Sequence, residues 1–262
     1  MQPSAHPRAR QTDIVVVAET GSTNADLLAQ VDDLHGPSLL LAESQTAGRG
    51  RMGRSWHSAP QQSLTFSLAW PFRLALHQML GLPLAVGVAL AQALAAYGVQ
   101  VQLKWPNDIL KDGKKLAGIL LESTHSSHDP DTTWAIIGVG MNLQVPPTLE
   151  AQIGQAVADA PWLAQLDRNT LAAHLLHHLA SVLEQFEQAG WPSFIEQWQQ
   201  LHAFNGQDVV ILEQGKVLQQ GRALGVDAQG RLLLATSAGV ETVLTGDVSL
   251  RSQAQYQQML EK

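Results

Sequence analysis

The chain has 262 residues, of which 45% are hydrophobic and 15% are charged, a balance that excludes an intrinsically disordered protein. It has no cysteine, which excludes disulfides, thiolate zinc sites, iron–sulfur clusters and cysteine nucleophiles and fits a cytoplasmic protein. No apolar run reaches the ~18 residues of a membrane span, and residues 1–12 lack the apolar stretch of a secretory signal. We therefore expect no membrane association and a loose N-terminal tail.

Residue patterns predict a domain of mixed helices and strands over 13–204. Short β-branched or alternating runs indicate strands, whereas longer runs with helical spacing indicate helices. In chain order we expect a strand at 14–18, a helix at 23–31, a strand at 39–42, a long loop at 44–60, a strand at 63–70, a helix at 76–97, a strand at 101–105, a hairpin of 107–110 with 115–122, a strand at 134–139 and helices at 170–189 and 192–204.

A second, β-rich unit is predicted after a boundary near 204–206. Turn residues separate five short β-branched runs, a spacing typical of a small barrel. The expected strands are 209–212, 217–226, 232–235, 240–244 and 248–251. The predicted division is thus a tail at 1–12, a first domain at 13–204, a barrel domain at 205–253 and a C-terminal tail at 254–262.

Charge is unevenly distributed along the chain. The net charge is −7, yet the window 49–115 holds eight basic residues and two acidic ones. A basic segment inside an acidic protein suits a small anion better than a long nucleic acid. A chance cluster of charges on a solvated face remains an alternative.

The densest part of this window is Gly48-Arg49-Gly50-Arg51-Met52-Gly53-Arg54. It matches G-x-G-x-x-G, but a loop with Pro60 follows in place of a helix, so a dinucleotide-binding fingerprint is excluded. Glycines let backbone N–H groups approach a ligand, and guanidinium groups pair with phosphates. The segment is either an anion-binding loop or a disordered basic surface loop.

Three other polar segments are ambiguous when taken singly. Residues 104–108 with Lys114 and Lys115 suit phosphates and a hydrated Mg²⁺, or form an ordinary hairpin with a charged tip. Gly138 and Gly140 allow close approach of a ligand, or simply soften the end of a strand. Ser22-Thr23-Asn24 suits ligand binding or the capping of a helix.

Several familiar site patterns are missing from the sequence. His174 and His178 are four residues apart on a predicted helix, but no H-E-x-x-H pattern or third ligand accompanies them. No P-loop and no Gly-x-Ser-x-Gly elbow is present. The sequence therefore predicts neither a metal site formed by protein side chains nor a serine nucleophile.

Five segments occur in one order and at suitable intervals between residues 14 and 251. They are Ser22-Thr23-Asn24, Gln45-x-x-Gly48-Arg49-Gly50-Arg51-x-Gly53-Arg54-x-Trp56, Lys104-Trp105-Pro106-Asn107-Asp108, Lys115-Leu116-Ala117-Gly118-Ile119-Leu120 and Gly138-x-Gly140-x-Asn142. Together they resemble the motifs of the biotin protein ligases, and the resemblance covers nearly the whole chain.

The resemblance implies an α+β fold. A class II aminoacyl-tRNA synthetase-like mixed sheet packed by helices forms the catalytic biotin- and ATP-binding domain, and a small Src-homology-3-like β-barrel follows it. The implied reaction converts biotin and MgATP to biotinyl-5′-AMP, then transfers biotin to a lysine of a biotin carboxyl carrier protein such as that of acetyl-CoA carboxylase. The implied small molecules are ATP, Mg²⁺ and biotin as substrate.

The resemblance also assigns site residues. The implied catalytic residues are Lys115, Arg51 and Asp108, the last as a helper in deprotonating the acceptor lysine. The implied biotin-binding residues are Ser22, Thr23, Asn24, Gln45, Gly48, Arg49, Gly50, Arg51, Lys115, Gly118, Leu120 and Gly138, with Gly140 shaping the same pocket. The implied ATP- and adenylate-binding residues are Arg49, Arg51, Met52, Arg54, Trp56, Lys104, Trp105, Asn107, Asn142 and Lys115. Mg²⁺ is expected mainly through ATP, with Asn107 as a candidate ligand, and Arg251 is expected to reach toward the nucleotide.

Three other functions compete with biotin ligation. A lipoate–protein ligase is the nearest, but its Arg-Arg-x-Ser-Gly-Gly-Gly signature is missing. A DNA-binding repressor is disfavoured by the charge of −7 and by the 12 residues before the first strand, so no specific DNA binding is expected. A non-catalytic biotin-binding module is disfavoured by the phosphate-side cations Lys115, Arg49 and Arg51. A monomer and a weak homodimer are both compatible with the sequence.

Overall fold

A computed structural model describes residues 6–58, 60–148, 150, 157–213, 215–244 and 248–260. A seven-stranded mixed sheet forms the first domain, with strand order β1-β2-β3-β7-β6-β5-β4. Only β1 and β2 pair in parallel within this sheet. Its strands are β1 (Asp13–Thr20), β2 (Ser38–Gln45), β3 (Ser63–Phe72), β4 (Gln102–Lys104), β5 (Asp108–Lys111), β6 (Lys114–His125) and β7 (Thr133–Asn142).

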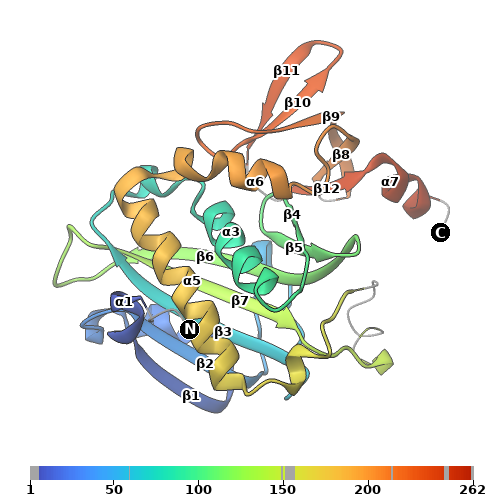
Figure 1. Ribbon diagram of the computed structural model, residues 1–262. Coiled ribbons are helices and arrows are strands. Elements are labelled where there is room, and N and C mark those ends of the chain that lie inside the picture. The colour runs from blue at the N-terminus through green and yellow to red at the C-terminus, as the bar shows by residue number, and fades with distance from the viewer. Residues whose placement is uncertain are drawn as a thin grey trace.

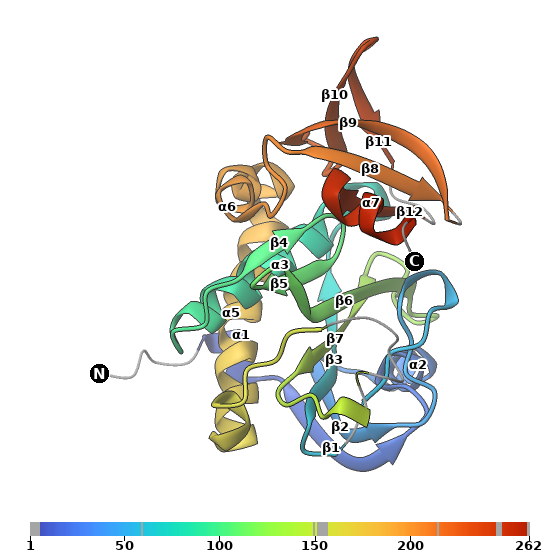
Figure 2. The ribbon, with the colours of Figure 1, turned by 90° about the vertical axis from the view of Figure 1, so that its right-hand side faces the viewer.

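Helices cover both faces of this sheet. The α-helices are α1 (Pro7–Arg10), α2 (Thr23–Ala29), α3 (Leu82–Ala95), α5 (Arg168–Ala189), α6 (Ile195–Leu201) and α7 (Gln253–Leu260), and the 3-10 helices are η1 (Val31–Asp33), η2 (Arg51–Gly53), η3 (Leu76–Met79), η4 (Leu163–Gln165) and η5 (Trp191–Phe194). Helices α3 and α5 lie on one face, and α2 lies on the other (Figures 1 and 2).

The alternation of β3 explains this two-sided packing. Leu64, Phe66 and Leu68 point to one face and join the large apolar core, because successive side chains of a strand point to opposite sides. The intervening Ser63, Thr65 and Ser67 point to the α2 face and are also buried. Within this buried polar row, Ser67 has hydrogen-bond partners on that side, whereas Thr65 Oγ1 has none among the described residues.

The helix expected at 76–97 is interrupted, and that prediction is wrong in its extent. Residues 76–79 form η3, and α3 begins at Leu82 after Gly81, which has a φ of 82°. A Cβ at Gly81 would lie 2.4 Å from the Trp191 ring, so the break lets these segments pack closely. The expectation that no apolar run is as long as a membrane span is also wrong, because Leu76–Ala95 is long and apolar enough to cross a membrane. However, 67% of its most apolar part is buried in the protein, as in the core helix of a globular domain.

The helix expected at 192–204 is also shorter. Trp191–Phe194 forms η5, and α6 runs from Ile195 to Leu201. The chain then leaves the helix, and Ala203 N–H donates to the Leu103 carbonyl of β4 at 2.9 Å. A hydrogen bond to β4 therefore takes the place of the last helical turn that the sequence predicts.

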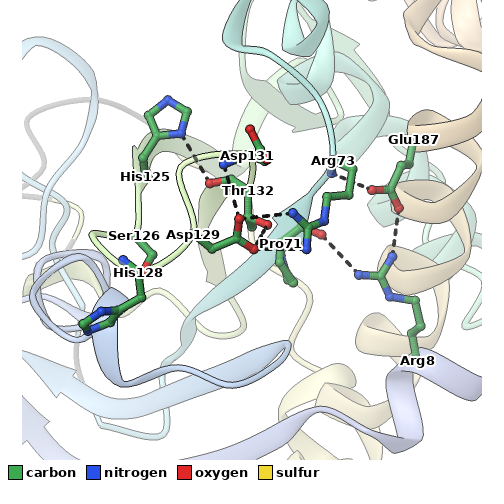
Figure 3. A network of polar contacts seen from close by, with 10 residues as sticks. All are labelled: Arg8, Pro71, Arg73, His125, Ser126, His128, Asp129, Asp131, Thr132 and Glu187. Carbon is green, nitrogen blue, oxygen red and sulfur yellow. Dashed lines mark hydrogen bonds and ion pairs between the residues drawn. The ribbon is translucent and has the colours of Figure 1, made fainter.

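Residues 6–12, which were expected in a loose tail, include α1, and this helix packs on α5. Arg8 forms an ion pair with Glu187 at 3.0 Å, and its guanidinium lies 4.2 Å from the Trp70 ring centroid. Glu187 also accepts from Arg73 N–H, and Arg73 pairs with Asp129 (Figure 3). The expected C-terminal tail likewise contains α7.

The C-terminal unit is a five-stranded antiparallel sheet of order β11-β10-β9-β8-β12. Its strands are β8 (Asp208–Glu213), β9 (Lys216–Val226), β10 (Leu232–Thr236), β11 (Gly239–Val243) and β12 (Val248–Ser252). The turn after β9 is tied to the first domain, because Trp191 donates to the Asp227 carbonyl and Trp105 to the Gly230 carbonyl, at 2.9 and 3.0 Å. In Figures 1 and 2 this sheet lies at the β4 end of the larger one.

Candidate active site

A cavity of about 740 Å³ opens on the α2 face of the large sheet. The basic side chains that line it are Arg49, Arg51, Arg54, Lys104, Lys114, Lys115 and Arg251. Among the described lining residues, Asp108 is the one with a carboxylate. Such a cavity attracts anions, because the field of several cations is focused by its low-dielectric walls.

The floor of the cavity follows from strand register. Gly118 of β6 lies opposite Gly140 of β7, and Gly140 lies opposite Thr65 of β3. Asp108 of β5 is the partner of Gly118 on the other side, and Lys104 of β4 is the partner of Asp108. Two adjacent glycines leave a flat surface in the middle of this row, and the ionic side chains stand at one end of it.

Trp56 lies on that flat surface. A Cβ at Gly140 would lie 2.2 Å from the indole, and one at Gly118 would lie 3.5 Å from it. The indole N–H is buried and has no hydrogen-bond partner, and the Lys115 ammonium lies 5.7 Å from the ring centroid. The glycines are therefore required for close packing of an aromatic side chain against the sheet.

The other end of the cavity is polar and almost uncharged. Ser22 is the N-cap of α2, and Thr23 and Asn24 are buried at its first turn. Thr23 donates from N–H and Oγ1 to Gln45 Oε1, at 2.8 and 3.0 Å. Thr23 Oγ1 also lies 2.7 Å from Ser67 Oγ, and Ser67 donates to Asn24 Oδ1 at 2.5 Å. This end therefore presents oriented hydroxyl and amide groups.

Asp108 lies between two lysines at the charged end. Its Oδ1 is 2.6 Å from Lys115 Nζ, and its Oδ2 is 3.2 Å from Lys104 Nζ. Burial raises the pKa of Asp108, but the charges of Lys115 and Lys104 outweigh it and lower that pKa to about 2. Burial lowers the pKa of Lys104 to about 8, against the attraction of Asp108. Burial also lowers the pKa of Arg251, which enters from β12.

The glycine–arginine loop is folded over the cavity. Gly50 N–H donates to the Arg54 carbonyl at 2.7 Å, and Trp56 N–H donates to the Gly48 carbonyl at 2.8 Å. Arg49 forms an ion pair with Glu122 of β6, and Arg51 Nη1 donates to Asn107 Oδ1 at 3.4 Å. This segment is therefore an ordered loop fixed to the sheet by two of its arginines.

The structure brings together most of the expected site residues. Those that line the cavity are Ser22, Thr23, Asn24, Gln45, Arg49, Gly50, Arg51, Arg54, Trp56, Lys104, Trp105, Asn107, Asp108, Lys115, Gly118, Leu120, Gly138, Gly140 and Asn142, together with Arg251. Gly48 and Met52 do not line it. A Cβ at Gly48 would lie 2.4 Å from the Trp56 carbonyl oxygen, so that glycine serves loop packing, and Met52 is 58% exposed.

Three lining residues are held by structural contacts. The Trp105 side chain is fully buried, and its N–H is bonded to the C-terminal domain. Asn142 Nδ2 donates to the Ala158 carbonyl at 3.2 Å. Asn107 Nδ2 donates to the Ile119 carbonyl at 2.6 Å. These side chains shape the walls and are less available to a ligand than the motif comparison implies.

Two residues of this site were missed from the sequence. Ser67 belongs to the polar row of β3, and the alternation of 63–68 was a signal for it, since three polar residues share one face of an apolar strand. Glu122 carried no local signal, because its contact with Arg49 joins positions 73 residues apart.

Protein ligands for a metal ion are scarce in the cavity. The described part of the chain has no cluster of three or more His, Asp or Glu side chains suited to a metal. Asn107 Oδ1 accepts from Arg51, and both Asp108 oxygens face lysines. The donor set therefore does not form a protein-built Mg²⁺ site.

Comparison with known proteins identifies the family. Residues 16–142 match the model of the biotin/lipoate A/B protein ligase family, and residues 205–251 match that of the biotin protein ligase C-terminal domain. The bifunctional ligase/repressor BirA of Escherichia coli is 34% identical, over 91% of this chain and 74% of the relative. The biotin–[acetyl-CoA-carboxylase] ligase of Mycobacterium tuberculosis is 36% identical, over 91% of this chain and 88% of the relative.

A solved structure agrees with these matches. The biotin protein ligase of Aquifex aeolicus in complex with biotin and ATP superposes with a TM-score of 0.76 and is 27% identical, over 92% of this chain and 99% of that one. Both domains of this chain are thus matched in sequence, and nearly its whole length is matched in structure. The chain therefore belongs to the biotin protein ligase family.

Proposed function

We propose that this chain activates biotin with ATP to biotinyl-5′-AMP and then transfers the biotinyl group to a lysine of a biotin carboxyl carrier protein. One observation carries the proposal. A single cavity joins an almost uncharged hydrogen-bonding end to a strongly cationic end, across a glycine floor covered by an indole. Biotin has a matching order of groups, with a neutral ureido ring, an apolar tail and a carboxylate.

In this proposal each part of biotin has its own part of the cavity. Thr23, Gln45 and Asn24 bind the ureido ring, because their hydroxyl and amide groups are buried and oriented by one network. The apolar tail lies along the indole of Trp56, which itself covers the glycine floor. The carboxylate then points to Lys115, whose ammonium stands beside the indole.

The cationic end makes the first step feasible. The biotin carboxylate oxygen attacks the α-phosphorus of ATP, a P–O bond forms, and the bond to pyrophosphate breaks. Two anionic groups repel each other unless cations lie between them, and Lys115, Lys104 and Arg251 converge on this end. Since the substrate carboxylate is itself the nucleophile, the protein contributes positioning and electrostatic stabilisation.

Asp108 has a positioning role in this proposal and is not the general base suggested by the motif comparison. An effective base has a pKa near the working pH, whereas the pKa of Asp108 is about 2. Its two oxygens hold the ammonium groups of Lys115 and Lys104 in place. The acceptor lysine must therefore lose its proton to another group.

Mg²⁺ enters the proposal as the counter-ion of ATP. The chemistry that it supplies is the neutralisation of phosphate charge. The nearby Asn107 and Asp108 side chains already face cations, so the ATP phosphates would hold the ion.

In the second step the acceptor amine attacks the acyl carbon, and the bond from that carbon to AMP breaks. The folded loop 48–54 protects the mixed anhydride from water before that attack.

The proposal also includes the finer fold class of each domain, the cellular location, the oligomeric state and the lack of specific DNA binding. The mixed sheet packed by helices supports a class II aminoacyl-tRNA synthetase-like domain. Strand β9 pairs with both β8 and β10 through irregular register shifts, which supports a Src-homology-3-like unit. We place the protein in the cytoplasm, where ATP and carboxylase carrier proteins are found together, as a monomer or weak homodimer without specific DNA binding.

The proposal is tested by exchange of labelled pyrophosphate into ATP with purified protein, in the presence of biotin, lipoate or neither. Exchange that depends on biotin is expected, followed by transfer of biotin to a carrier domain and no transfer when the acceptor lysine is replaced by arginine. Exchange with lipoate in place of biotin would assign the chain to lipoate ligation. Biotin binding without exchange would leave a binding module and overturn the proposal.

A further inference from the structure

Glu122 lies outside the motif residues, at the rim between the loop and the polar end of the cavity. It follows Leu120 by two residues on β6, so its side chain is on the same sheet face as Leu120 and Gly118. Its partner on β7 is Ile136. The Glu122 side chain is 24% exposed, which leaves its carboxylate mostly shielded from solvent.

Both oxygens of this carboxylate are in use. Oε1 forms the ion pair with Arg49 of the glycine–arginine loop. Oε2 accepts a hydrogen bond from Asn24 Nδ2 at 2.9 Å. One side chain thereby connects the loop over the cavity to the first turn of α2, where the proposed ureido site lies.

The carboxylate also sets the direction of the hydrogen bonds beyond it. An ionised carboxylate only accepts, so the Asn24 amide nitrogen faces Glu122 and its oxygen faces Ser67. Ser67 therefore uses its single proton on Asn24 Oδ1. Both neighbours of the Thr23 hydroxyl, Ser67 Oγ at 2.7 Å and Gln45 Oε1 at 3.0 Å, are then acceptors, so Thr23 Oγ1 shares its single proton between them. The remaining lone pairs of Thr23 Oγ1 are left to accept from a ligand N–H.

From this arrangement, and resting on the proposed function, we propose that Glu122 is a positioning residue that couples biotin recognition to loop closure. Through Asn24 and Ser67 it fixes Thr23 as an acceptor for a ureido N–H of biotin. Through Arg49 it holds the loop over the bound adenylate. Glu122 acts through these neighbours and touches neither the α-phosphate nor the acyl carbon.

The test compares Glu122→Gln with Glu187→Gln as a matched control. Glu187 has the same side-chain exposure of 24% and also pairs with an arginine, Arg8, at 3.0 Å (Figure 3), but it lies on α5 and does not line the cavity. For each variant, the KM values for biotin and ATP, the release rate of biotinyl-5′-AMP and the thermal unfolding midpoint are measured.

Glu122→Gln should raise the KM for biotin and the rate of adenylate release by about ten- to a hundredfold, as expected for lost hydrogen bonds to a charged group. The KM for ATP should change little, because Glu122 does not line the phosphate end. Glu187→Gln should leave both KM values and the release rate unchanged. Equal kinetic effects of the two variants, or a loss of stability alone, would overturn the proposal.

Two further variants test separately the effect of Glu122 on biotin binding and its effect on loop closure. Ser67→Ala cuts the relay, so adding Glu122→Gln to it should speed adenylate release without a further rise in the biotin KM. Arg49→Gln breaks the loop contact from an exposed side chain and should speed release on its own, which keeps the test decisive if Glu122→Gln does not fold. A wild-type protein without biotin-dependent exchange would refute the proposed function itself, before any variant is compared.

Discussion

Replacing Asp108 by asparagine should show how the cationic end of the cavity is held together. The substitution keeps the shape of the side chain and removes its negative charge. In the native protein that charge lies between the ammonium groups of Lys115 and Lys104, at 2.6 and 3.2 Å. The variant leaves two buried or half-buried cations facing each other without a counter-charge.

The size of the effect follows from the pKa of Asp108. Its ordinary value is 3.8, and the folded protein lowers it to about 2, because the attraction of the two lysines outweighs the burial. A pKa difference of this size stabilises the folded protein by about 2–3 kcal/mol when the carboxylate is ionised. For a chain of this length that amounts to roughly 4–12 °C in the unfolding midpoint.

The pH dependence has a defined sign. Because the folded pKa of Asp108 lies below the unfolded value, its contribution is complete above about pH 4 and is lost as the pH falls through about 2. Lys104 adds a second dependence, since burial lowers its pKa to about 8. As the pH rises through 8, Lys104 loses its proton, and its share of the attraction to Asp108 disappears.

Urea denaturation of wild type and Asp108→Asn between pH 6 and 9 tests both statements. We expect a difference in unfolding free energy of about 2–3 kcal/mol at pH 7, shrinking toward the contribution of Lys115 alone as the pH passes 8. A variant as stable as wild type at pH 7 would refute the role of Asp108 as counter-ion. A difference that stays constant across pH 8 would refute the assignment of Lys104 as its second partner.

Three other predictions concern the same cavity. Lys115→Met should lower biotin-dependent pyrophosphate exchange by about 10²–10³, as for the loss of one preorganised donor; an exchange rate near that of wild type would remove Lys115 from the mechanism. The kcat/KM for ATP should fall above about pH 8 as Lys104 deprotonates, and Lys104→Met should abolish that inflection in a pH–rate profile. Gly140→Ala should cost about 1–3 kcal/mol of stability or displace Trp56, because its Cβ would lie 2.2 Å from the indole; unchanged stability together with unchanged tryptophan fluorescence would contradict the packing described here.

Local pattern was sufficient for many elements but not for their boundaries. The strand at 63–70 was predictable because its apolar and polar residues alternate, and the structure places β3 at Ser63–Phe72. The helix at 76–97 was overextended, because its alanines and leucines fit one long helix. Gly81 breaks it in order to pack against Trp191, and that neighbour lies 110 positions away in the chain.

In the site, too, the residues of local motifs were predictable, whereas their neighbours from distant parts of the chain were not. The motif residues were predictable as a set, since most of them line one cavity. Strand order was not predictable, and it is strand order that places Gly118, Gly140 and Thr65 in one row. The role of Trp105 was also hidden, because a tryptophan in a ligand-binding motif gives no sign that its N–H bonds to Gly230 of the other domain.

The C-terminal domain is part of the site, and its attachment explains how. Two indole N–H groups, from Trp105 and Trp191, hold the turn at 227–230 against the first domain. This fixes the orientation of the small sheet, and its last strand, β12, then carries Arg251 into the cavity. Burial lowers the pKa of the Arg251 guanidinium, and the charge of Asp108 opposes that shift. Arg251 therefore interacts electrostatically with the charged groups at the phosphate end. A change in domain orientation would therefore alter the cationic end of the cavity before it altered the polar end, which is built entirely from the first domain.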